Sequence, residues 1–359
     1  MNDKEKQIII DYREKKDLFK KLERIALEKL EQIVKDCNVR IYTINHRIKE
    51  EDSLLGKLER KGDKYNSLFD ITDILGLRLV CYFADEVDVL ARRLEESFNI
   101  DWTESIDKRK FLSTNSFGYL SVHYICSLKE SKELSPDILN IRFEVQMCSL
   151  LQHVWAVMEH DLGYKTKFGV PRAVSRDFSR LAGLLEIADE HFTRIRDTVS
   201  NYTEHVRQKI ENDDANDIPI DSVSLDEYMR SSKNMRAFLQ VIANMCNAEI
   251  YDETAENYIQ QLAWLRIETI GELQQMMARN NSLALQMART SLAVSKLDIF
   301  SSTVALRFLC RAELVSGEYT EKQMREFFSL SIKDKDRCAR YAKELFLEYN
   351  NSNNRQEQL

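Results

Sequence analysis

The stretch Arg142-Phe-Glu-Val-Gln-Met-Cys148 (RFEVQMC) decides the fold expected for the first half of the chain. Its residues alternate as in a β-strand, with Phe143, Val145 and Met147 on one side and polar residues on the other. The apolar side has an obvious use as core. The polar side carries Glu144 between a guanidinium and an amide, in a segment that otherwise has a buried character. The strand therefore raises the question of what a carboxylate does there.

The composition sets limits on the class of protein. The chain has 359 residues, of which 43% are hydrophobic and 31% charged, so we expect a soluble protein with a substantial core. It has no apolar run of about 18 residues and no apolar segment typical of a secretory signal, so no contact with a membrane is expected. The seven scattered cysteines favour free thiols in a reducing cytoplasm. A net charge of −7 argues against a general nucleic-acid binder.

The pattern along the chain predicts two domains of different class. Residues 1–211 are expected to form an α+β domain, a mixed β-sheet flanked by helices, and the acidic segment 212–222 is the expected linker. Residues 223–349 have helical periodicity throughout, and the polar tail 350–359 is expected to be disordered. The first domain is predicted to contain helices at 4–36, 38–61, 85–98, 149–164 and 174–211, and strands at 77–83, 118–127 and 141–148.

Polar residues on two of these strands can form one functional face. Tyr119, Ser121 and His123 share one side of their strand, and Glu144 and Gln146 share one side of theirs. If the two strands pair in the matching register, these side chains meet on a single face of the sheet. A solvent-facing side of an antiparallel sheet gives the same pattern, and for any one residue that alternative is the more common.

A second group of residues surrounds the start of the first predicted strand. Asp73 directly precedes this strand, and a carboxylate there, paired with Glu144, could hold Mg²⁺ and nucleotide phosphates. Gly76 permits close approach of the backbone, and Arg78 lies within the apolar run that follows. Basic residues also cluster upstream of Asp73. Such a cluster is usually a solvated face, so it indicates a phosphate-binding role only if it faces Asp73. The donors in this upstream run are Arg47, Lys49, Ser53, Lys57 and Arg60.

Five motifs in this order resemble the synthetase domain of the RelA/SpoT alarmone synthetases, and most closely its small single-domain members. The motifs are RIKEEDSLLGKLERK (47–61), DILGLR (73–78), GYLSVH (118–123), EVQ (144–146) and HVWAVMEHDLGYK (153–165). The resemblance implies a nucleotidyltransferase-related fold. It also implies that the β,γ-pyrophosphate of ATP is transferred to the 3′-hydroxyl of GDP or GTP, with Mg²⁺ as cofactor. Residues 223–350 carry no resemblance to a named family.

The resemblance also implies a role for each matched residue. Asp73 and Glu144 would be the catalytic carboxylates and the metal ligands, and Glu144 would orient or deprotonate the acceptor hydroxyl. Tyr119 would stack on the acceptor base. ATP would be bound by Arg47, Lys49, Ser53, Lys57, Arg60 and Arg78, and the acceptor by Tyr119, Ser121, His123, Gln146 and His153.

Departures from the family pattern leave the acceptor open. A lysine and an arginine that the family usually carries are replaced here by Asn115 and Leu120, and a second arginine is replaced by Cys148. An acceptor with fewer 5′-phosphates is therefore an alternative, such as the 3′ end of tRNA, which the family's toxin branch modifies in toxin–antitoxin systems or phage defence. A further alternative is a catalytically inactive nucleotide-binding regulator. Assembly into a homo-oligomer is also left open.

Overall fold

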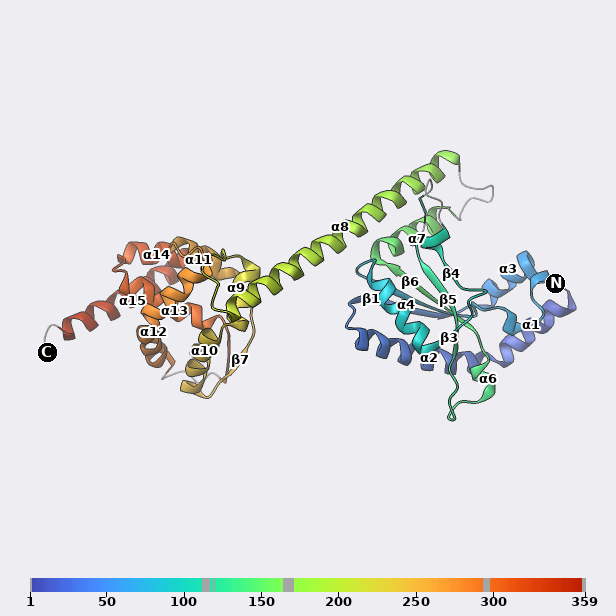
Figure 1. The fold of residues 1–359 in the computed structure, drawn as a ribbon, viewed down its shortest axis with the longest axis horizontal. Helices are drawn as coiled ribbons and strands as arrows, with labels where there is room; N and C mark the ends of the chain where they lie inside the picture. The colour runs from blue at the N-terminus through green and yellow to red at the C-terminus, as the bar shows by residue number, and fades with distance from the viewer. Residues whose placement is uncertain (1, 112–116, 119, 164–170, 293–297, 357–359) are drawn as a thin grey trace. The chain divides into compact units, whose positions relative to one another are not determined.

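The chain forms two compact units, Met1–Asp197 and Thr198–Leu359. The computed structural model describes residues 2–111, 117–118, 120–163, 171–292 and 298–356 (Figure 1). The division falls inside one long helix, α8 (Arg172–Glu211), and not at the end of this helix, where the sequence predicted the boundary. No helix in the described ranges combines the length and the apolar character needed to cross a bilayer.

A six-stranded mixed sheet forms the centre of the N-terminal unit. The strands lie in the spatial order β1-β2-β6-β5-β3, and β4 pairs with β5. β2 and β6 run parallel, whereas the other neighbours are antiparallel. The predicted α+β class with a mixed sheet flanked by helices is therefore confirmed. The strands are β1 (Ile41–Ile48), β2 (Leu75–Cys81), β3 (Phe98–Ile100), β4 (Ile106–Asp107), β5 (Val122–Leu128) and β6 (Phe143–Ser149).

One face of this sheet is apolar and carries the core of the unit. Leu77 of β2, Val145 of β6 and Tyr124 of β5 lie side by side on this face, because they are paired residues of neighbouring strands. Helices α2 and α4 bury their apolar stripes in the same core. The helices of this unit before α8 are α1 (Asp3–Glu14), α2 (Lys16–Cys37), α3 (Glu51–Lys61), α4 (Glu86–Ser97), α5 (Lys108–Phe111), α6 (Pro136–Leu139) and α7 (Leu150–Gly163), with 3₁₀ turns at Gly62–Lys64 and Leu68–Asp70.

Two predictions near the N-terminus are wrong. The single helix expected over 4–36 is interrupted at Lys15, which is the C-cap of α1 and the N-cap of α2. The sequence predicts a helix over 38–61, but the first part of this range forms the strand β1. β1 is an edge strand, so exposed polar side chains are tolerated and the apolar alternation typical of a buried strand is weak. The strand expected from residue 118 begins at Val122.

The C-terminal unit is helical, as expected, apart from one small sheet. Two short strands, β7 (Glu249–Tyr251) and β8 (Ile299–Ser301), pair in parallel. The last helix continues to residue 356, so the predicted disordered tail is helical up to that point and its remainder lies outside the described residues. The helices after α8 are α9 (Ser222–Ser231), α10 (Lys233–Cys246), α11 (Ile259–Trp264), α12 (Ile270–Leu292), α13 (Val304–Ser316), α14 (Glu321–Ser329) and α15 (Lys335–Gln356), with a 3₁₀ turn at Glu256–Tyr258.

The segment expected to be a linker, residues 212–222, is part of the C-terminal core instead. Ala215 and Ile218 are buried there, and the Ile270 N–H donates a hydrogen bond to the Ile218 carbonyl. The acidic residues that suggested a linker include Asp221, whose carboxylate caps α9. The end of α8 contributes Val206 and Ile210 to the same core. The structural boundary therefore precedes the predicted one because these apolar residues are buried with the C-terminal helices.

We expect Ile210→Ala to destabilise the C-terminal unit alone. Ile210 is buried in its core, and removal of a buried isoleucine side chain costs about 2–5 kcal/mol. Hydrogen exchange should show faster exchange in α9–α14 and unchanged exchange in the strands of the N-terminal sheet. Ser200→Ala, at an exposed position of the same helix, is the control. Faster exchange in β2 and β6 of the Ile210→Ala variant would show that the two units share a core.

Candidate active site

The pairing of the strands brings the predicted site residues onto one face of the sheet, opposite the apolar core. Gly76 of β2 lies opposite Glu144 of β6. Two residues further along, Arg78 lies opposite Gln146, and Gln146 lies opposite His123 of β5. Residues two apart on a strand project to the same side, so both rows share one face. The register that the polar-face prediction required is therefore present.

A cavity of about 190 Å³ opens on this face. Both predicted carboxylates, Asp73 and Glu144, line it, together with three of the other predicted residues, Arg47, Arg78 and Gln146. The sequence therefore identified a set of residues that share one space. The complete lining is Asn45, His46, Arg47, Asp73, Gly76, Leu77, Arg78, Glu144 and Gln146.

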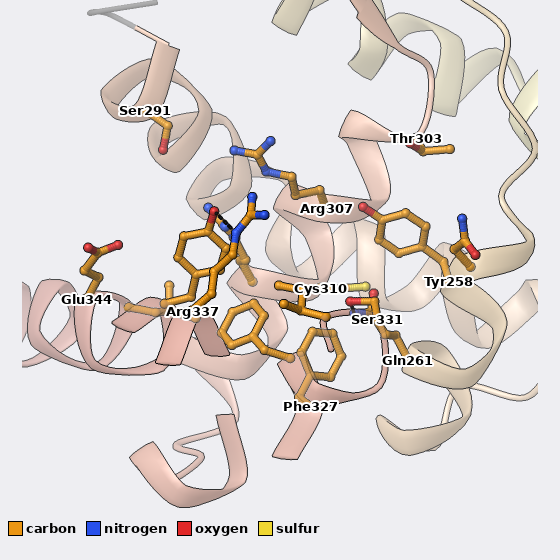
Figure 2. A pocket seen from close by; sticks show the side chains of 16 residues that line it. Tyr258, Gln261, Ser291, Thr303, Arg307, Cys310, Phe327, Ser331, Arg337 and Glu344 are labelled. Carbon is orange, nitrogen blue, oxygen red and sulfur yellow. Dashed lines mark hydrogen bonds between the residues drawn. The ribbon is translucent and has the colours of Figure 1, made fainter. Parts of the chain in front are cut away.

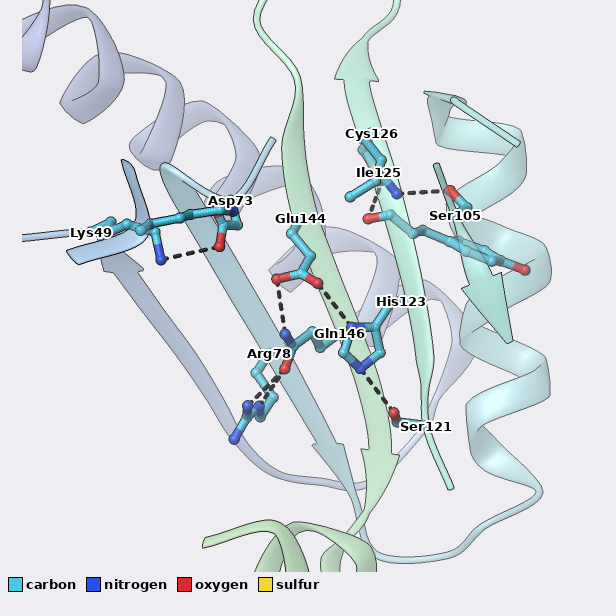
Figure 3. Close-up of polar contacts among 12 residues, drawn as sticks. Lys49, Asp73, Arg78, Ser105, Ser121, His123, Ile125, Cys126, Glu144 and Gln146 are labelled. Atoms are coloured by element: carbon cyan, nitrogen blue, oxygen red, sulfur yellow. Dashed lines mark hydrogen bonds and ion pairs between the residues drawn. The ribbon is translucent and has the colours of Figure 1, made fainter. Parts of the chain in front are cut away.

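Asp73 is held between two lysines. Lys49 Nζ lies 3.1 Å from Asp73 Oδ2, and Lys57 Nζ lies 2.6 Å from Asp73 Oδ1; Figure 3 shows the first of these contacts. Burial alone would raise the pKa of Asp73, but the hydrogen bond and charge of Lys57, together with the charge of Lys49, hold this pKa below its usual value. Asp73 is therefore an ionised carboxylate at neutral pH, and it faces two of the predicted ATP-binding cations.

Glu144 lies at the centre of a hydrogen-bonded chain that crosses three strands (Figure 3). Its Oε1 is 2.8 Å from His123 Nδ1, and its Oε2 accepts a hydrogen bond of 2.9 Å from Gln146 Nε2. At one end, Arg78 donates to Gln146 Oε1 through Nε and Nη2, at 2.9 and 2.7 Å. At the other, His123 Nε2 is 2.9 Å from Ser121 Oγ. Each side chain in this series of hydrogen bonds is thus oriented by its neighbours.

The charge state of Glu144 follows from this arrangement. Burial would raise its pKa, but the bonds from His123 and Gln146 more than offset burial and hold the pKa below its usual value. The charge of Asp73 acts on Glu144 in the opposite direction. The two carboxylates are therefore close enough to interact electrostatically, and both are ionised at neutral pH.

The remaining predicted residues differ in their placement. His153 of α7 lies at the edge of the site, with Nδ1 3.5 Å from Arg78 Nη1. Ser53 and Arg60 lie on the exposed side of α3 and do not line the cavity. Tyr119, the predicted stacking residue, lies outside the described residues.

Lys108, a residue not assigned from the sequence, also belongs to this region. Burial lowers its pKa, and the nearby charges of Glu144 and Arg78 act on it in opposite directions. Its backbone N–H donates to the Ser121 carbonyl at 2.9 Å, which places the start of α5 beside one of the predicted acceptor-binding residues. A run of three basic residues was its only sequence signal, and such a run is usually solvated.

A chain of hydrogen bonds among buried and partly buried groups fixes the backbone next to the site. Ser149 at the end of β6 donates to Asp189 Oδ2 of α8 at 2.6 Å, and the Ser149 hydroxyl accepts from the Gln152 backbone N–H at 3.1 Å. Gln152 Oε1 in turn accepts from the Leu120 N–H at 3.0 Å. This chain fixes the backbone that leads into β5 and ties it to α8. Its members are far apart in sequence, and no motif marks them.

The positions that depart from the family pattern are not equivalent. Cys148 is only 1% exposed, so a guanidinium could not be placed there without rearrangement of its surroundings. Leu120 is half-buried, and Asn115 lies outside the described residues. The replacement of arginine by Cys148 is therefore coupled to local packing and is not a simple loss of charge from an open pocket.

Comparison with known proteins adds independent information. Residues 46–168 match the family model described as "Region found in RelA / SpoT proteins". The chain is 27% identical over 159 residues to GTP pyrophosphokinase YjbM of Bacillus subtilis, spanning 44% of this chain and 72% of that protein. It is 25% identical over 156 residues to GTP pyrophosphokinase YwaC of the same organism, spanning 43% and 72%.

Solved structures with a detectable similarity include two bacterial proteins. One is small alarmone synthetase 2 from Bacillus subtilis, with 25% identity, a TM-score of 0.43 and coverage of 51% of this chain and 98% of that chain. The other is a GTP pyrophosphokinase family protein from Streptococcus pneumoniae, with 25% identity, a TM-score of 0.45 and coverage of 54% and 96%.

We expect Gly76→Ala and Gly76→Val to fill the cavity in graded steps without disturbing the fold. A Cβ at this position would meet no atom within 4 Å, and valine favours a strand. Thermal unfolding should therefore be unchanged in both variants. The affinity for ATP, measured by titration, should fall slightly in the alanine variant and about tenfold or more in the valine variant. If the Gly76→Val variant binds ATP as tightly as the wild type, this cavity is not part of the binding site.

We expect Asp189→Asn to stabilise the N-terminal unit at high pH only. Burial raises the pKa of Asp189 to about 6, although the bond from Ser149 lowers it. The folded state thus binds the proton more tightly than the unfolded state, and stability falls as the pH rises through about 6. Asparagine carries no charge and can still accept from Ser149, so the variant should be more stable by about 1–2 kcal/mol near pH 8 and similar near pH 4.

The measurement is thermal unfolding of the wild type and the variant at the two pH values. Asp177→Asn is the control, because Asp177 lies on the same helix and its ion pair with Arg180 is exposed. Equal effects of Asp189→Asn at both pH values would show that Asp189 is ionised in the folded protein throughout this range.

Proposed function

We propose that the N-terminal unit is an ATP-dependent pyrophosphokinase, because residues 46–168 match the RelA/SpoT family model. The observation that carries the proposal is the pair of ionised carboxylates, Asp73 and Glu144, that share one cavity with Arg47 and Arg78. The relatives named GTP pyrophosphokinase support GDP or GTP as the acceptor. The reaction would move the β,γ-pyrophosphate of ATP to a 3′-hydroxyl.

The donor side of the site fits the triphosphate of ATP. Transfer of phosphoryl groups depends mainly on alignment and charge neutralisation, which Arg47, Arg78 and the two lysines at Asp73 can provide. Lys49 and Lys57 would exchange the Asp73 carboxylate for phosphate oxygens when ATP binds. This exchange would free Asp73 to serve as a ligand.

The two carboxylates also fit the cofactor that the resemblance implies. Mg²⁺ is usually bound through one or two carboxylates together with substrate phosphates and water. Asp73 and Glu144 match this donor set, since both are ionised and line the same cavity. When bound, Mg²⁺ would neutralise charge on the transferred phosphates.

The acceptor side of the site fits activation of a hydroxyl. Glu144 would accept the proton of the 3′-hydroxyl, while His123 and Gln146 hold the carboxylate in a fixed orientation. The 3′-oxygen would then form a bond to the β-phosphorus of ATP, the bond from this phosphorus to the α,β-bridging oxygen would break, and AMP would leave. An inactive regulator would have no need for an ionised, oriented Glu144.

The test is incubation of the full chain with γ-labelled ATP and Mg²⁺, with GDP, GTP, AMP, ATP and deacylated tRNA as parallel acceptors. We expect label on GDP and GTP. Label on tRNA alone would favour the toxin-type alternative, and the absence of label on every acceptor would favour an inactive nucleotide-binding module.

We expect Asp73→Asn to reduce transfer to every acceptor by about a hundredfold or more, because the ligand charge is lost while the shape is kept. The fold should persist, which circular dichroism can verify. Asp137→Asn is the control, since Asp137 is exposed on α6 and does not line the cavity. Unchanged activity with the usual Mg²⁺ dependence would exclude Asp73 from the mechanism.

A further inference from the structure

The C-terminal unit contains a cavity of about 640 Å³ of its own (Figure 2). Its lining residues come from the segment 257–261, from α12, α13, α14 and α15, and from Thr303, Ser331 and Ile332 beside these helices. Every one of them belongs to Thr198–Leu359. Ligand sites in proteins commonly have volumes of about 300–1,000 Å³. The cavity is therefore large enough for a small molecule, and it is separate from the site of the N-terminal unit.

Three arginines line this cavity. Arg307 and Arg311 are four residues apart on α13 and thus share one face of this helix, and Arg337 projects from α15. In the described ranges, no carboxylate forms an ion pair with Arg307 or Arg337 within 4.0 Å. Glu344 is the acidic residue in the lining, and its side chain is exposed. Like charges at this helical spacing repel each other, so their gathering around one cavity favours an anionic ligand.

Aromatic rings contact all three guanidinium groups, and Arg307 lies 5.4 Å from the centroid of the Phe308 ring. Arg337 Nε donates to the Tyr341 hydroxyl at 3.0 Å, and the Arg337 guanidinium lies 5.4 Å from the centroid of the same ring. Arg311 lies 5.7 Å from this ring and 5.9 Å from the ring of Phe328. Such contacts restrict the guanidinium groups before any ligand binds. Less conformational entropy is then lost on binding.

A different part of the lining is polar without being charged. Gln261 is buried and donates through Nε2 to Ser331 Oγ at 2.8 Å. Tyr258 is close enough to the arginines for their charges to act on its hydroxyl. Burial raises the pKa of this hydroxyl, and the charges of Arg307 and Arg311 act to lower it. Figure 2 shows Tyr258, Gln261 and Ser331 grouped apart from Arg337. Amide and hydroxyl groups of this kind can bind the sugar or base of a ligand whose phosphates contact the arginines.

We propose that this cavity is a binding site for a phosphorylated nucleoside. Guanidinium groups bind phosphate through paired hydrogen bonds, and aromatic rings and guanidinium planes accept a base by stacking. The cavity exceeds what a bare pyrophosphate needs, and its neutral polar groups would have no role toward an inorganic anion. A cavity of about 640 Å³ fits a small molecule better than the extended backbone of RNA. The assignment does not depend on the activity of the N-terminal unit.

The test uses the full chain with GTP, ATP and sodium triphosphate as probes, in hydrogen exchange and in calorimetric titration. GTP or ATP should protect α13 and the start of α15, in addition to any protection at β1, β2 and β6. The two sites report in different segments, so failure of one does not affect the reading of the other. Protection confined to the N-terminal strands would overturn the proposal.

The informative variant combines Arg307→Gln with Arg337→Gln, since both side chains are exposed and their replacement leaves the core unchanged. The affinity measured at the C-terminal site should fall about a hundredfold, roughly tenfold for each charge-assisted contact. The matched control, Lys322→Gln with Arg325→Gln, removes two exposed charges from α14 and should stay within about twofold of the wild type. Equal losses in both variants would indicate general electrostatic attraction and contradict a built site.

The probes also separate the ligand classes. Sodium triphosphate should bind more weakly than GTP or ATP, because it lacks the base and sugar. Equal affinity for all three would reduce the site to one for inorganic polyphosphate, and binding of a single-stranded RNA oligonucleotide without binding of either nucleotide would replace the proposal with an RNA site.

Discussion

The candidate active site depends on the parallel pairing of β2 with β6. This register sets Gly76 opposite Glu144 and Arg78 opposite Gln146. The space left by the missing side chain of Gly76 is therefore next to the charges of Glu144 and Arg78 and the amide of Gln146. A slip of β6 by one residue relative to β2 would turn Glu144 toward the apolar core, where its charge could not be solvated. The buried leucines and valines on the opposite face thus fix the register, and the register fixes the site.

The polar face could be predicted from the sequence because apolar and polar residues alternate in the first half of β5 and of β6. Apolar residues on one side identify the core, and the residues between them must then share the other side. The acidic residue at the start of β2 could be found for a related reason, since Asp73 directly precedes an apolar run. In each case the signal lies within a few residues of the functional side chain.

The features that could not be predicted depend on contacts between distant segments. β1 carries polar residues that an edge strand tolerates, so its strand character becomes evident only once it pairs with β2. The support of Leu120 by Gln152, Ser149 and Asp189 joins three elements and leaves no local pattern. Likewise, the acidic composition around Asp221 resembles a linker, although this carboxylate caps a helix in a packed unit.

The two lysines at Asp73 have a consequence for the thermodynamics of ligand binding. Without a ligand, the site already holds its own counterions, so the arrival of a polyphosphate is an exchange of ionic partners within the protein. The electrostatic gain is then smaller than the number of nearby cations suggests, because each new contact replaces an existing one. Discrimination between ligands would rest on geometry more than on total charge. Ionic strength would accordingly influence the rate of encounter more than the lifetime of the complex.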